Sequence, residues 1–198
     1  MSNQKKLAQH QAVQVASLAV TILGGTAIWS IHAGIRDWSV SAPLVVFFCI
    51  LTINTFFSIR YFHPFEPARS RSQWLINSIL IFLYLLLETS FNDPLRYTII
   101  LTILFAIATV KYLALRKTLG TDTTIERKIR VDSYATLVGV VAVIGMFIGV
   151  QWVISWTLAI GNIVANIYLL WANPLYIRPL GIFQRLTTKF RNLVSGKK

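Results

Sequence analysis

Polar side chains recur along one face of an apolar segment near the C-terminus of the chain. Ser155, Asn162 and Asn166 are separated by seven and four residues, so a helix with about 3.6 residues per turn places them on one face. Asn54 occupies an earlier apolar segment and is expected to meet this face. An amide that faces lipid is costly, so these side chains are expected to face protein or water.

Two interpretations of this polar face remain open. In the first, the side chains form hydrogen bonds between helices, each of which contributes about 0.6 kcal/mol in a membrane protein. In the second, they line a path for a solute or an ion. Under either interpretation, the sequence predicts a polar interior along this helix.

Ionisable side chains gather at the ends of the apolar segments. His32, Glu88 and Arg96 belong to one such end, and Glu88 lies about one helical turn inside it. An ionisable residue within a membrane segment is a candidate functional site. A carboxylate at this shallow depth also suits an interfacial ion pair with Arg96 or Arg36. We therefore expect either such a pair or an entry site for protons or cations formed by His32 and Glu88.

The sequence contains no recognised catalytic motif: no Gly-x-Ser-x-Gly, no His-Glu-x-x-His, no phosphate-binding loop and no dinucleotide fingerprint. Its single cysteine, Cys49, lies inside an apolar run, and its three histidines lie at the ends of such runs. These positions predict no intramolecular disulfide, no metal site and no cofactor. A non-enzymatic role is therefore favoured, and an enzyme that acts on lipid through Glu88 and His32 is the lesser alternative.

The composition is typical of a membrane protein. Hydrophobic residues make up 55% of the 198 residues and charged residues only 13%, whereas soluble proteins average about 25% charged. The segment 133–177 contains no Asp, Glu, Lys or Arg. Because a helix crosses the apolar core of a bilayer with about 20 residues, this segment fits two spans joined by a tight turn.

The apolar segments predict one all-α domain, a polytopic membrane protein with six transmembrane helices. Thr123 and Glu126 fit a capping box, so the fifth helix is expected to begin before it reaches the membrane. The expected spans cover residues 11–33, 43–61, 74–90, 95–115, 133–150 and 152–174. Residues 181–194 have apolar side chains on one face and basic ones elsewhere, which predicts an amphipathic surface helix.

Basic residues predict the orientation of this bundle. With six spans, all of the 19 Lys and Arg residues except Arg36 and Arg96 fall on one side of the membrane. Lys and Arg are retained in the cytoplasm, so both termini are expected there. The inner membrane of a bacterium, or an equivalent membrane, is the expected location. The net charge of +12 is spread over the ends of the spans in this way, which argues against nucleic-acid binding.

Part of the basic charge is expected to form a cytoplasmic surface that binds anionic lipid or an acidic partner. Its residues are Arg127, Lys128, Arg130, Arg185, Lys189 and Arg191. Small residues predict a different kind of contact, the close packing of helices. They include Gly139, Gly145 and Gly149, the last two forming a Gly-x-x-x-Gly pair.

Two functions are consistent with these features. The first is a non-enzymatic membrane subunit for permeation or transport of a small solute or ion, working as a homo-oligomer or with another membrane subunit. The second is a structural or regulatory protein that docks a cytoplasmic partner or anionic lipid through its basic surface. The polar interior favours the first function, and the basic loop and C-terminal helix favour the second.

Overall fold

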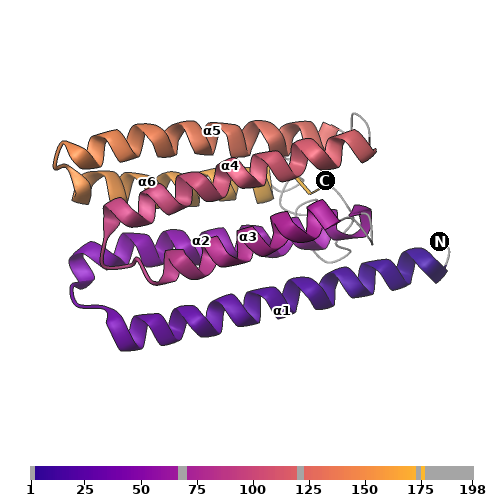
Figure 1. The fold of residues 1–198 in the computed structure, drawn as a ribbon, viewed down its shortest axis with the longest axis horizontal. Coiled ribbons are helices and arrows are strands. Elements are labelled where there is room, and N and C mark those ends of the chain that lie inside the picture. Colours follow the sequence, from indigo (N-terminus) through magenta and orange to yellow (C-terminus); the bar gives the residue numbers. More distant parts are fainter. Residues whose placement is uncertain (1–2, 67–70, 120–122, 173–174, 177–198) are drawn as a thin grey trace, which may run out of the picture.

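The computed structural model describes residues 3–66, 71–119, 123–172 and 175–176. Within these ranges the chain is helical and contains no strand, which confirms the all-α prediction. The helices run antiparallel to one another along a common direction (Figure 1). They are α1 (Asn3–Gly34), α2 (Trp38–Phe62), α3 (Arg71–Glu88), α4 (Pro94–Leu119), α5 (Thr123–Phe147) and α6 (Gln151–Ile167), with a 3₁₀ turn at His63–Phe65 and a π-helical turn at Tyr168–Ala172.

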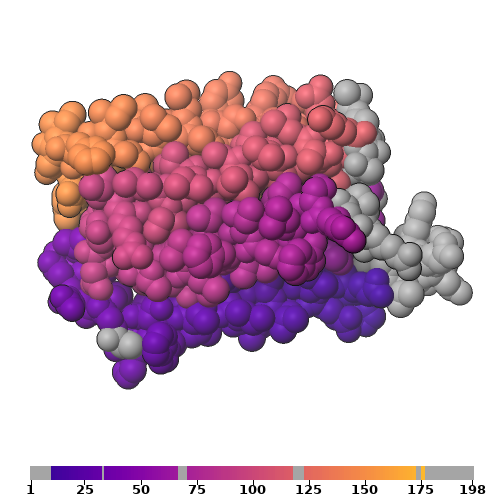
Figure 2. Space-filling model, viewed as in Figure 1, coloured from indigo at the N-terminus to yellow at the C-terminus, as the bar shows by residue number. Residues whose placement is uncertain are grey.

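Five of these helices, all except α3, are long and apolar enough to cross a membrane. Helix α3 has 18 residues, and the polar residues Arg71 and Glu88 stand at its two ends. Large apolar side chains are exposed along the outside of the bundle, among them Leu18, Phe82 and Val141. Figure 2 shows one such face, on which α1, α3 and α4 lie side by side. This exterior is compatible with an integral membrane protein.

The helix starts follow from capping side chains. Helix α2 begins at Trp38, five residues before the expected span 43–61, and Asp37 caps its start by accepting a hydrogen bond from the Ser39 N–H at 2.8 Å. The Ser39 hydroxyl and N–H together hold the pKa of the Asp37 carboxyl below its usual value. Helix α5 begins at Thr123 and continues unbroken to Phe147, as the capping box predicts.

The connections between helices divide the bundle into two ends. Helices α2 and α4 end, and α3 and α5 begin, at the end where α1 begins, on the right of Figure 1. We call this the basic end, because Arg60, Lys111, Arg116 and Arg130 belong to it. The α1–α2, α3–α4 and α5–α6 connections lie at the opposite end, which we call the far end.

Glycines permit close contacts of α5. A Cβ atom added at Gly139 would meet the Thr102 side chain of α4, and one added at Gly145 would meet Ile154 of α6. Gly149 differs from the prediction, because it lies beyond the end of α5 in the turn to α6. Its φ of +91° is a conformation that residues with a Cβ rarely adopt, so this glycine serves the turn rather than helix packing.

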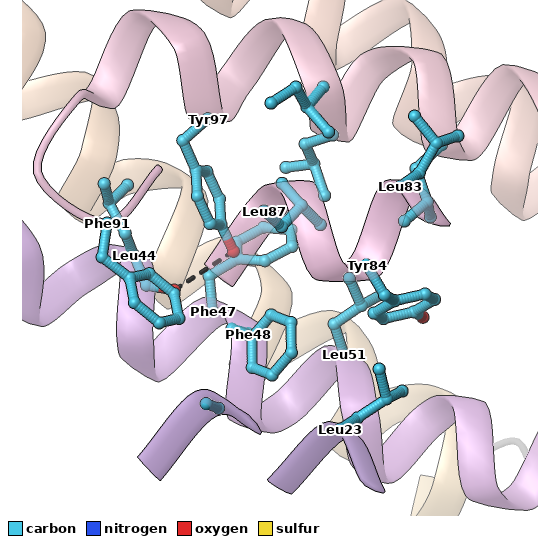
Figure 3. Close-up of a cluster of buried hydrophobic side chains, with 14 of the residues drawn as sticks. Leu23, Leu44, Phe47, Phe48, Leu51, Leu83, Tyr84, Leu87, Phe91 and Tyr97 are labelled. Atoms are coloured by element: carbon cyan, nitrogen blue, oxygen red, sulfur yellow. Dashed lines mark hydrogen bonds between the residues drawn. The ribbon is translucent and has the colours of Figure 1, made fainter. Parts of the chain in front are cut away.

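The interior near the far end is a dry apolar core (Figure 3). The ring of Phe48 packs edge-on against Phe91, with 5.7 Å between ring centroids. The buried Tyr97 hydroxyl donates to the Leu44 carbonyl at 3.1 Å, so the polar atom of its side chain is satisfied within the core. We call this part of the interior the dry half.

Candidate functional site

A cavity of about 270 Å³ occupies the interior toward the basic end. It lies among α1, α2, α3, α4 and α5, and the layer that separates it from the dry half includes Leu51 and Tyr84. Its wall differs from the dry half because it contains four charged side chains and one histidine. They are His63, Glu66, Lys111, Lys128 and Asp132.

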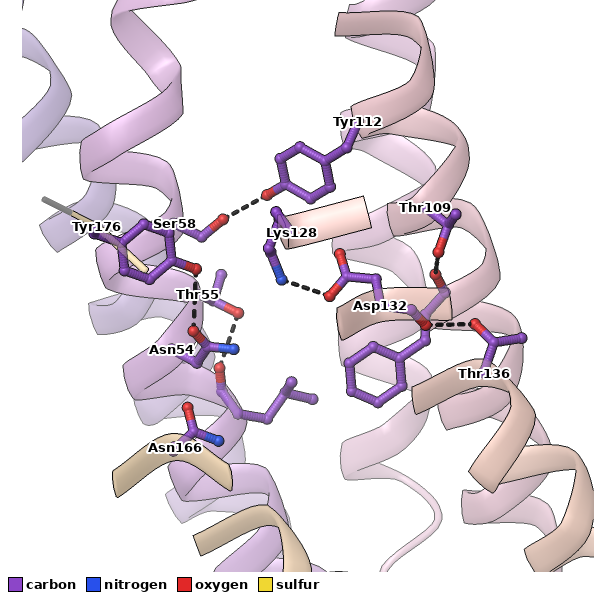
Figure 4. Close-up of polar contacts among 12 residues, drawn as sticks. Asn54, Thr55, Ser58, Thr109, Tyr112, Lys128, Asp132, Thr136, Asn166 and Tyr176 are labelled. Atoms are coloured by element: carbon purple, nitrogen blue, oxygen red, sulfur yellow. Dashed lines mark hydrogen bonds and ion pairs between the residues drawn. The ribbon is translucent and has the colours of Figure 1, made fainter. Parts of the chain in front are cut away.

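Lys128 and Asp132 form a deep ion pair in this wall (Figure 4). They stand one turn apart on α5, and 2.6 Å separates Lys128 Nζ from Asp132 Oδ1. The two side chains are only 6% and 1% exposed. Lys128 Nζ also lies 5.3 Å from the centroid of the Tyr112 ring, which adds a cation–π contact. The second carboxylate oxygen, Asp132 Oδ2, is buried and has no hydrogen-bond partner.

Glu66 and Lys111 form a second ion pair, which we call the mouth pair. Lys111 Nζ lies 2.6 Å from Glu66 Oε1, and the Asn77 amide donates to Glu66 Oε2 at 3.2 Å. His63 Nδ1 lies 3.8 Å from the same oxygen, and the His63 side chain is 35% exposed. The greater exposure of His63 places the mouth pair nearer to solvent than the deep pair.

Hydroxyl groups connect the helices around the deep pair. The Thr55 hydroxyl of α2 is hydrogen-bonded to the Tyr84 hydroxyl of α3. One turn along α2, Ser58 is hydrogen-bonded to the Tyr112 hydroxyl of α4. All four side chains line the cavity. They supply uncharged donors and acceptors on the walls that face Lys128 and Asp132.

The predicted polar face of α6 lies elsewhere, in the contact between α2 and α6. The Asn162 amide donates to the Phe47 carbonyl of α2 at 3.1 Å. The Asn166 amide donates to Asn162 Oδ1 at 2.8 Å. Ser155 is buried, and none of these three side chains lines the cavity. Asn54 does line the cavity. Its side-chain oxygen accepts a hydrogen bond from the Tyr176 hydroxyl at 3.1 Å, so the partner of this oxygen is a tyrosine and not an asparagine of α6.

The predicted ionisable group at the far end is only partly assembled. Glu88 is buried, Thr26 is its hydrogen-bonding neighbour, and its Oε1 atom has no hydrogen-bond partner. His32 and Arg96 are exposed. Among the described residues no ion pair joins Glu88 to Arg96 or Arg36. Both arginines instead donate their backbone N–H groups to the Asn92–Asp93 turn.

Lys128, which was predicted to belong to the basic cytoplasmic surface, is not exposed. Arg130 is exposed and Arg127 is partly exposed, but Lys128 is buried in the cavity wall. The reason is the helical period of α5, because Lys128 precedes Gly139 by three turns and therefore shares the face that packs on α4. The surface helix predicted at 181–194, with Arg185, Lys189 and Arg191, lies outside the described residues.

Sequence reasoning missed both ion pairs of the cavity. The signal for the deep pair was available, since opposite charges four residues apart on a helix are neighbours. Gly139, which contacts Thr102 of α4, indicates which side of α5 faces the interior. The mouth pair has no comparable signal, because Glu66 follows the 3₁₀ turn after α2 whereas Lys111 belongs to α4, and the two meet only in the folded chain.

Comparison of the chain with protein-family models, with curated proteins and with solved structures found no match. Within the described part of the chain, no three His, Cys, Asp or Glu side chains form a group that could hold a metal ion. Two cations, two carboxylates and several hydroxyls line this cavity, which is partly open, because the lining residues Val15 and Ile81 are exposed on the outside of the bundle. A small polar molecule in this volume would meet both donors and acceptors.

Proposed function

We propose that this chain is a non-enzymatic membrane protein that binds a small polar solute or ion in its internal cavity and takes part in its permeation or transport. The observation that carries the proposal is the deep pair. Charged side chains inside a membrane bundle are costly and commonly mark the route of a solute or ion. Here Lys128 and Asp132 face a cavity, and Asp132 Oδ2 still lacks a partner.

The proposal includes six spans, with both termini in the cytoplasm of a bacterium or an equivalent compartment. Helix α3 is the sixth span: its 18 residues extend over about 27 Å, close to the 30 Å of a bilayer core. Basic residues cluster at the end where α2 and α4 finish, which supports a cytoplasmic basic end. The cavity then lies toward the cytoplasmic side of the membrane.

The dry half supports a carrier rather than an open channel. Phe48, Leu87 and Tyr97 are buried side by side between the cavity and the far end. A solute that leaves the cavity toward the far end has to pass this packed layer, so the helices must rearrange during transport. The exposed apolar side chains of α5, such as Val141 and Phe147, face lipid or another subunit of an oligomer.

Transport can be tested with the full chain reconstituted in liposomes. The vesicles are incubated with a defined mixture of amino acids, amines, carboxylic acids, sugars and alkali-metal ions, and their contents are quantified by mass spectrometry. We expect at least one solute to enter faster than in protein-free vesicles, and Asp132→Asn to reduce that uptake. Arg130→Gln is the matched control, because Arg130 lies on the same helix but is exposed. Equal uptake with and without protein would reject the proposal.

The second candidate is a regulatory protein that docks an acidic cytoplasmic partner or anionic lipid. Arg130 and Lys117 are exposed at the basic end, and Arg127 is partly exposed. Crosslinking in native membranes tests this role, with Arg127 and Arg130 both changed to Glu. A crosslinked protein or anionic lipid that disappears in this variant favours docking. Unchanged crosslinks, together with uptake that depends on Asp132, favour transport.

A further inference from the structure

The deep pair has an unused hydrogen-bond acceptor and unused hydrogen-bond donors. Asp132 Oδ2 is a carboxylate oxygen that lacks a donor, and it is buried, so a ligand reaches it once the Asp132 side chain turns toward the cavity. An ammonium group has three N–H donors, and one of those on Lys128 is used by Asp132 Oδ1. A buried polar group without a partner is destabilising, so the site favours a ligand that supplies the missing donor. The same ligand can accept hydrogen bonds from Lys128.

A simple ion does not fit these requirements. A metal cation at Asp132 Oδ2 would lie close to the Lys128 ammonium and bring no anionic group to offset that repulsion. A simple anion at Lys128 would lie close to the Asp132 carboxylate and bring no cationic group to offset it. Like charges repel strongly where water is excluded. The mouth pair repeats this pattern, since Lys111 and Glu66 are also in contact and His63 lies beside Glu66. The charges of the four ionised side chains in the cavity sum to zero, so the net charge of the cavity favours neither cations nor anions.

We propose that the cavity binds a small zwitterion of the amino-acid type, its ammonium group on Asp132 Oδ2 and its carboxylate on Lys128. A zwitterion presents a donor and an acceptor of opposite charge a few ångströms apart, as the deep pair does. This inference rests on the proposed function and specifies its substrate class. The hydroxyls of Thr55 and Ser58 lie on the facing wall and can bond the remaining polar atoms.

The size of the cavity limits the side chain of such a ligand. A volume of about 270 Å³ lies below the 300–1,000 Å³ that is usual for the pockets of drug-sized ligands. Much of the remaining wall is apolar and includes Leu23, Leu51 and Leu104. This volume suits a ligand of amino-acid size, of which glycine, alanine and serine are the simplest to test.

The test is a binding experiment on the full chain in lipid nanodiscs, read by isothermal titration calorimetry. The probes are glycine, L-alanine and L-serine, together with ethylamine and propionate, each of which carries one of the two charges of L-alanine, and propionamide, which carries neither. We expect at least one zwitterion to bind about tenfold or more tightly than all three single-function probes, because each lacks a charge-assisted hydrogen bond.

Variants of the deep pair locate the binding. Asp132→Asn and Lys128→Met are each expected to weaken binding of the zwitterion about tenfold to a hundredfold. Arg130→Gln is the control and should not change it. If a single variant does not fold, the exchanged pair Lys128→Asp with Asp132→Lys keeps both charges in the cavity. Binding retained by the exchanged pair supports the proposal, and binding that is unchanged in all variants overturns it.

The remaining outcomes separate this inference from the proposed function. If ethylamine or propionate binds as tightly as the zwitterions, the site recognises one charge, and the substrate class is wrong although the cavity is a binding site. If no probe binds but uptake still depends on Asp132, the class is wrong and the transport function stands. If no probe binds and no uptake occurs, both proposals fail.

Discussion

The two halves of the bundle interior are built from the same helices but have opposite chemistry. In the dry half, the aromatic and aliphatic side chains of α2, α3 and α4 fill the space, and the Tyr97 hydroxyl bonds to a backbone carbonyl. In the half toward the basic end, these helices and α5 surround a cavity with two ion pairs. One helix can therefore contribute to a packed core and to a polar cavity within a few turns.

The difference is informative because a buried ion pair is a weak way to stabilise a fold. Replacing such a pair by apolar residues of similar volume is often neutral or stabilising. The dry half illustrates the apolar solution, with side chains such as Leu87 fully buried. We call the half toward the basic end the charged half. Packing alone gives no physical reason for it to keep Lys128 and Asp132, whereas the proposed binding of a polar ligand would.

Tyr84 belongs to both halves. Its ring packs edge-on against Phe48 of the dry half, with 6.0 Å between ring centroids. Its hydroxyl is hydrogen-bonded to Thr55 in the cavity wall. A change in the cavity that breaks this hydrogen bond would therefore reach the aromatic packing of the dry half directly. In the proposed transport cycle, Tyr84 would be the most direct connection between the cavity and an opening of the far side.

The largest expected effect comes from breaking the deep pair. Asp132→Ala leaves the Lys128 ammonium buried and without its carboxylate, and we expect the free energy of unfolding to fall by about 3–5 kcal/mol. Unfolding in mixed micelles with increasing dodecyl sulfate, followed by circular dichroism, measures this change. The double variant Lys128→Met with Asp132→Leu should recover most of the stability and still lack solute uptake. A double variant that transports normally would contradict a functional role for the charged half.

A second change tests the dry half. Leu87→Ala removes a fully buried side chain, and we expect a loss of about 2–5 kcal/mol in the same unfolding measurement. Leu85→Ala is the control on the same helix, because Leu85 is 36% exposed. If transport requires the dry half to open, Leu87→Ala should also increase passive leak of the solute. Equal stability of the two variants would show that the far side of the bundle is not closely packed.

Much of the fold could be predicted from the sequence, because bilayer thickness restricts the lengths of apolar helices. The uncharged segment 133–177 contains most of α5 and all of α6, and the Thr123–Glu126 capping box marks where α5 begins. Helix α2 extends beyond the expected span 43–61 at both ends, and Pro43 lies inside it rather than at its start.

The candidate site was harder to predict, because the sequence does not state which face of a helix turns inward. Arg127, Lys128 and Arg130 follow one another on α5, and successive residues point about 100° apart. Only one of these three side chains, that of Lys128, faces the interior. Lys128 lies three turns before Gly139 and therefore on the same face of α5, the face that contacts α4. The asparagines of α6 were predicted to be buried or solvated, but their packing against α2 could be recognised only in three dimensions.

A smaller effect is expected where α5 crosses α4. Gly139→Ala places a Cβ atom against the Thr102 hydroxyl, and we expect the resulting shift to reduce stability by about 1–3 kcal/mol. Gly25→Ala is the matched control, because an added Cβ there has no neighbour within 4 Å. Since this crossing orients Lys128, Gly139→Ala should also weaken solute uptake, whereas Gly25→Ala should not. Identical behaviour of the two variants would remove the proposed link between helix packing and the cavity.

The smallest expected effect concerns the polar face of α6. Asn162→Leu removes the hydrogen bond to the Phe47 carbonyl and the one that Asn162 Oδ1 accepts from Asn166. Bonds of this kind contribute about 0.6 kcal/mol each in membrane proteins, so we expect a loss of about 1 kcal/mol. Because Asn162 does not line the cavity, solute uptake should remain at the wild-type rate. Asn54→Leu is the informative partner, since Asn54 does line the cavity and its substitution should slow uptake. If Asn162→Leu slows uptake as much as Asn54→Leu, the solute passes between α2 and α6, and the contrast between the charged and dry halves does not describe its route.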